Sequence, residues 1–253
     1  MSSDASSLLV LGDSLAFLAG TKALVPSDER LYPQVLGRLL EERTGRSWSV
    51  HSEVRAGWSV LTLSRSVATD RVLQARVAAA DAIVIGVGTM DATPAALPGR
   101  IGFGVRDAQT VRRRVTSRRR KMAWRAFARL YPALIRASGA RFPHTPPARL
   151  RTSWHSLAGE LRRLAPHAAL CGVVPAPHRC ALYAGSMRHH AEAVRVTTEA
   201  SAALGLPLVD LPALVGDQIE LLPDRIHLTV ELHSRVAAAM ADRLLAPPAA
   251  ASG

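Results

Sequence analysis

Short apolar runs alternate with longer amphipathic segments along most of the chain. Apolar runs that end at turn-forming residues predict buried β-strands, and they lie at residues 8–11, 47–54, 82–87, 168–174 and 206–211. Apolar side chains at helical spacing predict helices at residues 32–43, 64–80, 154–164, 188–204 and 229–245. Strands that alternate with helices indicate a three-layer α/β/α fold, in which helices cover both faces of a five-stranded parallel sheet with right-handed crossovers.

One segment, residues 92–150, interrupts this alternation. Prolines and glycines stand near its two ends, and apolar residues recur between them at helical spacing: Met122, Trp124, Phe127, Leu130, Tyr131, Leu134 and Ile135. The segment is too short and too charged for a core of its own, so we expect a partly helical cap inserted over the sheet. The chain is then a single domain over residues 1–246, followed by a disordered tail at residues 247–253.

Composition narrows the class of protein. The chain has 253 residues, 48% of them hydrophobic, which is enough for one sizeable core. No apolar run is long enough to span a bilayer, and Asp13 interrupts the first apolar stretch, which no basic region precedes. We therefore expect no signal peptide, no stable membrane insertion and a cytoplasmic location. Cys171 and Cys180, the only cysteines, fit no metal motif, so we expect no metal site.

The formal net charge of +12 comes from one segment. Residues 100–151 hold fifteen Lys or Arg against Asp107 alone, a net charge of +14, which leaves −2 for the rest of the chain. Three interpretations stay open: a solvated surface, a cap whose arginines bind an anionic acyl donor such as coenzyme A or an acyl carrier protein, and a nucleic-acid surface. The third is the weakest, because the aromatic residues stand at core-like helical spacing without a recognition motif. We expect no nucleic-acid partner.

Polar residues and glycines follow several of the predicted strands. Ser14 comes after the first strand, Gly57 after the second and residues 88–91 after the third, whereas Asp224 and His227 lie in a loop before the last helix. The carboxyl ends of parallel strands lie along one edge of a sheet, where residues far apart in sequence can meet. We therefore expect these residues to converge there.

Ser14 has the companions that a serine nucleophile needs. A serine hydroxyl is a weak nucleophile at neutral pH, and it requires a nearby base and a third group that orients the base. His227 can be that base, and Asp224 can hold one imidazole nitrogen while the other faces Ser14. A helix-compatible segment after Ser14 would add backbone N–H groups for an oxyanion. Taken singly, Asp13 and Ser14 can also be turn or N-cap residues, and Asp224 with His227 a pair that caps the last helix.

The combination of these blocks is much more specific than its parts. Their sequence order is Gly12-Asp13-Ser14-Leu15, Gly57, G-x-x-D at residues 88–91 and D-x-x-H at residues 224–227. In this order the chain resembles the SGNH (GDSL) hydrolase family over nearly its whole length. The resemblance implies a flavodoxin-like sheet and a catalytic triad of Ser14, Asp224 and His227. It also implies that the backbone N–H groups of Ser14 and Gly57 stabilise an oxyanion.

The third block departs from the family pattern. The family has Gly-x-Asn there, and the asparagine amide is its third oxyanion donor, but this chain has Met90. A thioether cannot donate a hydrogen bond, and losing one such donor typically lowers a rate by about 10²–10³. We therefore expect Thr89 or a cap residue to supply the missing donor. A non-catalytic binding protein stays open as an alternative.

A closer resemblance narrows the function. The segment 25–29, Gly57-Trp58, residues 89–91, the arginine-rich insert, Pro177-His178 and His189-His190 together resemble actinobacterial diglucosylglycerate octanoyltransferases. That resemblance implies transfer of an acyl group from an ester or thioester donor to a hydroxyl of a sugar or other small molecule, without a cofactor. Ester hydrolysis is the alternative. The candidate substrate contacts are Asp13, Trp58, Met90, Asp91 and His178.

Overall fold

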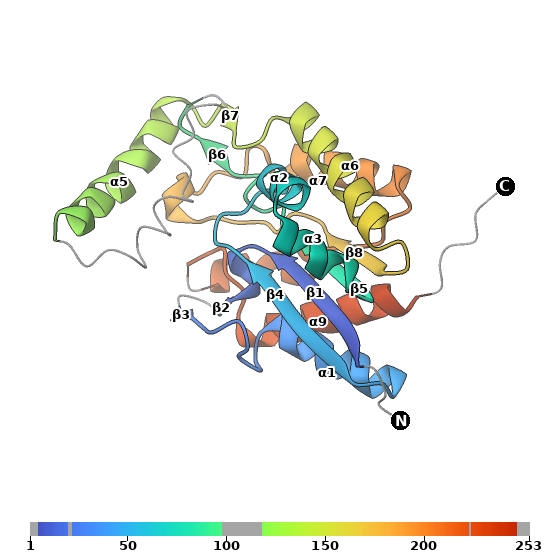
Figure 1. Ribbon diagram of the computed structural model, residues 1–253. Coiled ribbons are helices and arrows are strands. Elements are labelled where there is room, and N and C mark those ends of the chain that lie inside the picture. Colours follow the sequence, from blue (N-terminus) through green and yellow to red (C-terminus); the bar gives the residue numbers. More distant parts are fainter. Residues whose placement is uncertain (1–4, 20–21, 98–117, 223, 247–253) are drawn as a thin grey trace.

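A five-stranded parallel sheet forms the centre of the computed structural model, which describes residues 5–19, 22–97, 118–222 and 224–246. The strand order is β4(Trp48–Val54), β1(Ser6–Gly12), β5(Ala82–Gly86), β8(Ala169–Val173) and β9(Leu208–Val209) (Figure 1). Every neighbouring pair in this sheet is parallel. The predicted three-layer α/β fold is confirmed.

Helices cover both faces of the sheet. On one face lie α1(Tyr32–Thr44) and α9(Val230–Leu245), below the sheet in Figure 1. On the other face lie α2(Val60–Thr69), α3(Arg71–Ala78), α6(Pro147–Leu164) and α7(His190–Ala203). No helix in the described ranges is long and apolar enough to cross a membrane.

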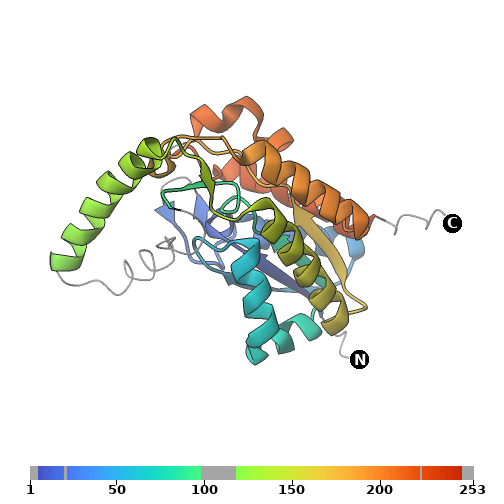
Figure 2. The same cartoon turned by 90° about the horizontal axis from the view of Figure 1, so that it is seen from above.

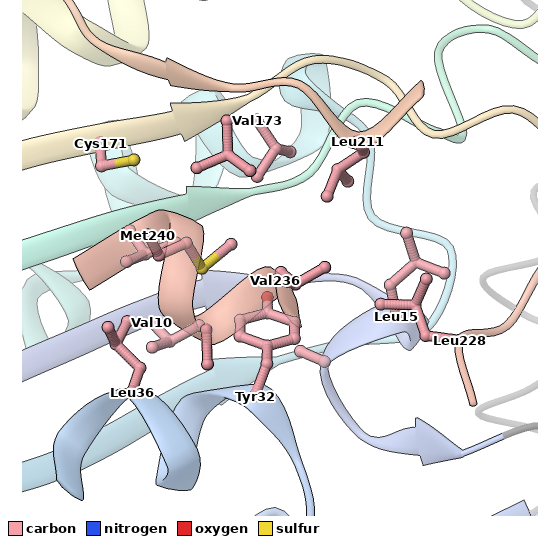
Figure 3. Packing of buried hydrophobic residues seen from close by; sticks show 14 of the residues in the cluster. Val10, Leu15, Tyr32, Leu36, Cys171, Val173, Leu211, Leu228, Val236 and Met240 are labelled. Carbon is pink, nitrogen blue, oxygen red and sulfur yellow. The ribbon is translucent and has the colours of Figure 1, made fainter. Parts of the chain in front are cut away.

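The sequence of β1 is continuously apolar because its side chains alternate between the two faces of the sheet and both faces are buried. Leu8 and Val10 pack into the core under α1 and α9, whereas Leu9 and Leu11 pack into the core on the opposite face. All four are at most 1% exposed. Figure 3 shows Val10 among side chains of both helices, Leu36 of α1 and Met240 of α9 among them. Burying one such side chain stabilises the fold by about 1.5–3 kcal/mol.

The helix predicted over residues 64–80 is two helices, α2 and α3. Ser59 begins α2 earlier than predicted, through a capping box with Thr62. Asp70 separates the two helices, because its backbone is extended and its Oδ1 accepts hydrogen bonds from the N–H groups of Val72 and Leu73. Asp70 thus ends one helix and caps the next, a role that apolar periodicity does not reveal.

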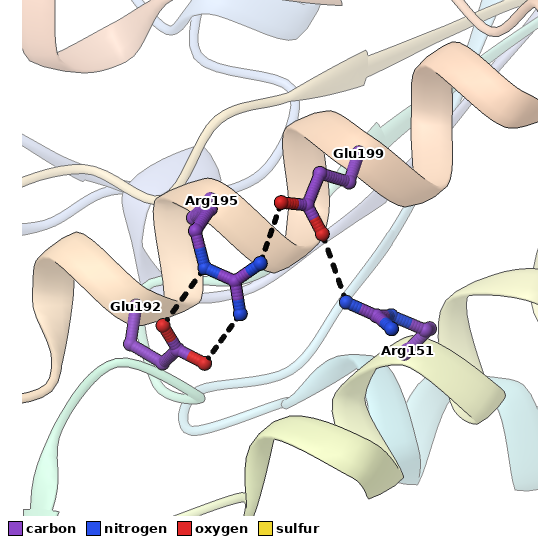
Figure 4. Close-up of polar contacts among 4 residues, drawn as sticks. All are labelled: Arg151, Glu192, Arg195 and Glu199. Atoms are coloured by element: carbon purple, nitrogen blue, oxygen red, sulfur yellow. Dashed lines mark hydrogen bonds and ion pairs between the residues drawn. The ribbon is translucent and has the colours of Figure 1, made fainter.

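A surface cluster of two arginines and two glutamates joins α6 to α7 through one ion pair. Arg195 binds both Glu192 and Glu199 within α7, and Arg151 of α6 binds the other oxygen of Glu199 at 2.8 Å (Figure 4). These side chains are about half exposed. Exposed pairs of this kind stabilise proteins little, so they align the two helices while the buried residues beneath supply the stability.

The inserted segment contains a long helix and a small ribbon. The strands β6(Pro94–Ala95) and β7(Phe142–Pro143) pair antiparallel, and α5(Arg118–Ala137) extends away from the body past the carboxyl edge of the sheet (Figures 1 and 2). Of its predicted apolar face, Tyr131 and Ile135 are buried, but Leu130 and Leu134 are 62% and 55% exposed. In the described carboxyl part of α5, the apolar face is therefore only partly covered by the rest of the protein.

Parts of the insert lie outside the described residues. The first arginine triplet, residues 112–114, is not described, nor are the side chains of the second, residues 118–120. The tail at residues 247–253 is not described either, so its predicted disorder stays a prediction. Because α6 begins at Pro147, the insert ends a few residues before the predicted boundary at residue 150.

Short elements that periodicity did not predict lie at the edge of the sheet. They are η1(Ser14–Ala16), β2(Leu18–Ala19), β3(Lys22–Ala23), η2(Ala181–Tyr183), α8(Leu211–Val215) and η3(Gly216–Leu221). The helix expected directly after Ser14 is only the single turn η1, which leads into the β2–β3 hairpin. The macrodipole of a long helix is therefore not available at Ser14.

The cap at Asp70 can be tested by replacement. Asp70→Ala removes the acceptor for two backbone N–H groups, so we expect the free energy of unfolding to fall by about 1 kcal/mol. Asp70→Ser keeps an acceptor and is the matched control. Urea unfolding followed by circular dichroism measures both. If Asp70→Ala unfolds at the wild-type urea concentration, the cap does not stabilise α3.

Candidate active site

Ser14, His227 and Asp224 form a hydrogen-bonded chain at the carboxyl edge of the sheet. Nε2 of His227 lies 2.9 Å from Oγ of Ser14, and Nδ1 lies 2.5 Å from Oδ2 of Asp224. With the proton on Nδ1, His227 donates to Asp224 while its Nε2 accepts from the Ser14 hydroxyl. The structure thus brings together a serine and a histidine that are 213 positions apart in sequence.

Both oxygens of Asp224 are engaged, which fixes the orientation of the imidazole. Oδ1 accepts from the backbone N–H groups of Ile226 and His227, at 3.2 and 2.9 Å, while Oδ2 holds Nδ1 of His227. Burial raises the pKa of Asp224, but the hydrogen bond and charge of His227, together with the two backbone N–H groups, outweigh it and leave the pKa below its usual value. An ionised Asp224 can stabilise a protonated imidazole.

The chain turns immediately after β1, which places Ser14 at the edge of the sheet. The N–H of Asp13 donates to Gly86 O, and Oδ1 of Asp13 accepts from the N–H of Leu15 at 2.9 Å, which caps η1. A Cβ at Gly12 would lie 2.8 Å from the Cβ of Ala16. Only glycine therefore allows the chain to fold back so tightly before the serine.

The loop after β4 lies beside the same turn. Arg55 N donates to Gly12 O at 3.0 Å, and Gly57 follows with a φ of +76°, a conformation that favours glycine. The backbone N–H groups of Ser14 and Gly57 make no hydrogen bond to any other residue in the described ranges. They are therefore available as donors to a ligand oxygen, as an oxyanion site requires.

The side chains of Thr89 and Met90 both lie within the protein interior. Thr89 is 2% exposed, and its Oγ1 accepts from the N–H of Ala176 in the loop after β8 at 3.2 Å. Met90 is 5% exposed, and its Sδ accepts a hydrogen bond from Oη of Tyr183 at 3.4 Å. Sequence reasoning missed Tyr183, because no motif or periodicity connects η2 with the segment around Met90.

Met90 and Tyr183 belong to a buried apolar cluster. The cluster also includes a residue of the loop that carries Asp224 and His227, which we call the triad loop. The buried members of the cluster are Met90, Ala96, Tyr131, Ile135, Ala140, Tyr183 and Ile226. Ile226 directly precedes His227, and Ile135 comes from the carboxyl half of α5. The cap therefore packs against the loop that carries the imidazole.

Three of the candidate substrate contacts are fully buried in this structure, and their contact with a substrate stays a prediction. Trp58 is 0% exposed and packs in the core beneath α2, with the guanidinium of Arg55 4.8 Å from its ring centroid. Asp91 is 0% exposed, and its Oδ2 accepts from the N–H of Val60 at the start of α2. His178 is 0% exposed and packs edge-on against Tyr183. In this structure these side chains contact other protein groups in the loops around Ser14.

Buried carboxyl groups stand next to the serine. Asp13 is 1% exposed, and burial raises its pKa to about 7, with the nearby Asp91 adding to the shift and the N–H of Leu15 opposing it. Burial likewise raises the pKa of Asp91 to about 6, against the hydrogen bonds from Thr145 and Val60. Asp13 therefore caps the turn η1 from the interior, and its contact with a substrate stays a prediction.

Groups that could bind a metal ion are not gathered at this edge. Within the described ranges, no three His, Cys, Asp or Glu side chains are arranged to hold a metal ion. Cys171 is buried in the core and Cys180 is half-buried, and both are free thiols.

The arrangement is that of a serine nucleophile with a histidine base and an orienting carboxylate, set on a parallel α/β sheet. The profile of the GDSL-like lipase/acylhydrolase family matches residues 10–235. The chain therefore belongs to this family of SGNH enzymes, whose members hydrolyse or transfer acyl groups.

Relatives and solved structures agree with that assignment. The chain is 30% identical to a diglucosylglycerate octanoyltransferase of Mycolicibacterium hassiacum, over 95% of each chain. It is 26% identical to the enzyme of the same name from Mycobacterium tuberculosis, over 92% of this chain and 90% of that one. A carbohydrate acetylesterase from Sinorhizobium meliloti, Est24, has the same fold, with a TM-score of 0.59, 14% identity and coverage of 94% and 98%.

The raised pKa of Asp13 predicts a pH-dependent stability. The folded protein keeps the proton up to about pH 7, whereas the unfolded chain releases it above about pH 4, so the free energy of unfolding falls as the pH rises through this window. Asp13→Asn keeps the acceptor for the N–H of Leu15 but cannot ionise. We expect it to raise the free energy of unfolding by roughly 1–3 kcal/mol more at pH 8 than at pH 5.

Thermal and urea unfolding at both pH values measure this difference. Asp210→Asn is the matched control, because Asp210 caps α8 through the N–H of Ala213 but is exposed. A variant of Asp13 with the same pH dependence as the wild type would show that this carboxyl ionises normally in the folded state.

Proposed function

We propose that this protein is a serine-dependent acyltransferase that moves an acyl group from an ester or thioester donor to a hydroxyl of a sugar or other small molecule. In the first half-reaction, Oγ of Ser14 attacks the carbonyl carbon while Nε2 of His227 takes its proton. The leaving oxygen or sulfur receives that proton, and an acyl-Ser14 ester remains. In the second half, the acceptor hydroxyl gives its proton to Nε2 of His227 and its oxygen bonds to the acyl carbon. The bond to Ser14 Oγ then breaks, and Ser14 Oγ takes the proton back from His227.

The hydrogen-bonded chain from Ser14 through His227 to Asp224 is the observation that carries this proposal. It supplies a nucleophile, a base within reach and an ionised group that favours the imidazolium. The N–H groups of Ser14 and Gly57 are the proposed donors to the oxyanion that forms in each half-reaction. These contacts support the proposal, because each proton that the two half-reactions move would pass through Nε2 of His227.

Two observations favour transfer over hydrolysis. The relatives that match this chain over nearly its full length are named as octanoyltransferases that act on diglucosylglycerate, so we propose a medium-chain acyl group and a glycoside hydroxyl. In addition, Ile135 of α5 packs with Met90 and Ile226 beside His227. Apolar residues on this side limit the access of water, which would otherwise compete with the acceptor.

The acyl donor is proposed to be a thioester of coenzyme A or of an acyl carrier protein. Such donors carry phosphate groups, and guanidinium groups bind phosphates in a bidentate manner. Arg129 and Arg136 are exposed on α5. The positive charge of residues 100–151 therefore suits an anionic donor.

Covalent labelling tests the nucleophile. A fluorophosphonate should label the wild-type protein at Ser14, and Ser14→Ala should abolish labelling, because no acyl or phosphonyl ester can then form. Ser64→Ala is the matched control, since Ser64 is also a buried serine but lies in α2. Persistent labelling of the Ser14→Ala protein, read by mass spectrometry, would reject the proposed nucleophile.

Product analysis tests transfer. With p-nitrophenyl octanoate as donor and diglucosylglycerate as acceptor, the wild type should form an acylated sugar, and the yield of free octanoate per p-nitrophenol should fall as the acceptor concentration rises. Both products should disappear in Ser14→Ala. Release of p-nitrophenol with free octanoate as the sole product at every acceptor concentration would instead establish a hydrolase.

A further inference from the structure

Tyr183 places its phenol beside Met90, the position where the family has the asparagine that donates to the oxyanion. Its Oη donates to Sδ of Met90 at 3.4 Å, and a thioether is a poor acceptor. Met90 follows β5 by only four positions, at the same edge of the sheet as Ser14. The Tyr183 hydroxyl could therefore leave this weak acceptor and form a much stronger hydrogen bond with a negatively charged oxygen.

The surroundings of Tyr183 connect it to the triad. It belongs to the same buried cluster as Ile226, the residue before His227. The loop that leads to it is tied to the triad loop, because the N–H of Arg179 donates to Arg225 O at 2.8 Å. The side chain of Tyr183 is therefore held in the buried cluster that contacts the loop carrying His227.

The phenol stays protonated under all ordinary conditions. Tyr183 is 4% exposed, and burial raises its pKa far above the usual value, with further contributions from Cys180, Tyr131 and the carboxyl of Asp13. Tyr183 can therefore donate a hydrogen bond but does not transfer its proton.

We propose that the hydroxyl of Tyr183 is the third donor to the oxyanion, taking the place of an amide that Met90 cannot provide. This inference rests on the acyl-serine chemistry proposed above. When Ser14 Oγ bonds to the carbonyl carbon, the carbonyl π-electron pair moves to oxygen, and the Ser14 proton goes to Nε2 of His227. The Tyr183 O–H then turns from Sδ of Met90 to the new oxyanion, beside the N–H groups of Ser14 and Gly57. No proton leaves Tyr183.

Kinetics of Tyr183→Phe test the proposal, because phenylalanine keeps the ring and removes only the donor. We expect kcat for p-nitrophenyl octanoate to fall about 100-fold with KM within about twofold. The affinity for a trifluoromethyl ketone, whose serine adduct carries an oxyanion, should fall by a similar factor. The matched control is Tyr131→Phe in the same cluster, whose hydroxyl is engaged by the N–H of Ala96; its kcat should stay within about twofold of the wild type.

Rescue distinguishes a donor from a packing residue. Asparagine at position 90 places an amide donor where the sulfur now lies, so Met90→Asn combined with Tyr183→Phe should recover at least 10-fold in kcat over Tyr183→Phe alone. Met90→Leu has a similar volume but no sulfur, and it leaves the Tyr183 hydroxyl free to turn. We expect its kcat at or above that of the wild type. This variant also tests the proposal if Tyr183→Phe proves unstable.

The outcomes separate this inference from the proposed function. If Ser14 is labelled but Tyr183→Phe keeps wild-type kcat and ketone affinity, Tyr183 is not an oxyanion donor and the acyl-serine chemistry stands. A loss that Met90→Asn does not rescue, with an equal loss in Tyr131→Phe, would likewise reject the donor role in favour of packing. A 100-fold loss of kcat in Met90→Leu would show that the sulfur itself is required. Absence of labelling at Ser14 would overturn both proposals.

Discussion

The pairing of β1 with both of its neighbours is the constraint on which the site depends. Residues 6–12 pair with β4 on one side, and residues 8–12 pair with β5 on the other. Since both faces of β1 are also buried, the strand has no freedom to shift: a slip by one residue would exchange Leu8 and Val10 with Leu9 and Leu11 between two differently packed cores. The position of Ser14, two residues past the strand, is fixed by that register.

The imidazole is held by a second and independent set of contacts. His227 precedes α9, whose first turn is capped by Thr229 through the N–H of Leu232. Leu228 and Leu232 pack in the same core cluster as Leu15, the residue after the nucleophile. The base and the nucleophile thus share one buried neighbourhood, although they come from opposite ends of the chain, so folding of the core and assembly of the site are one event.

The sequence predicted the strands and the meeting of Ser14 with His227 because both follow from rules that act along whole segments. Short, continuous apolar runs identify buried strands, and parallel strands have their carboxyl ends at the same edge of the sheet. Single side chains that override a pattern were not predictable in this way, as Asp70 shows by dividing one helical period into two helices. The contact between Tyr183 and Met90 joins residues 93 positions apart, in η2 and in the turn after β5, and neither short segment has a periodicity that predicts its neighbours.

Two carboxyl groups at this edge of the sheet, those of Asp224 and Asp13, have pKa values that are shifted in opposite directions. Asp224 has a lowered pKa and holds Nδ1 of His227, so in the proposed reaction it would stabilise the imidazolium that forms when Ser14 loses its proton. Asp13 directly precedes Ser14, and an ionised carboxyl there would oppose the negative charge of an oxyanion on the acyl group. Burial raises the pKa of Asp13 to about 7, so near neutral pH about half of these carboxyls carry no charge. Burial therefore keeps part of the Asp13 carboxyl groups neutral. A neutral carboxyl does not repel the oxyanion that the proposed reaction forms after attack by Ser14.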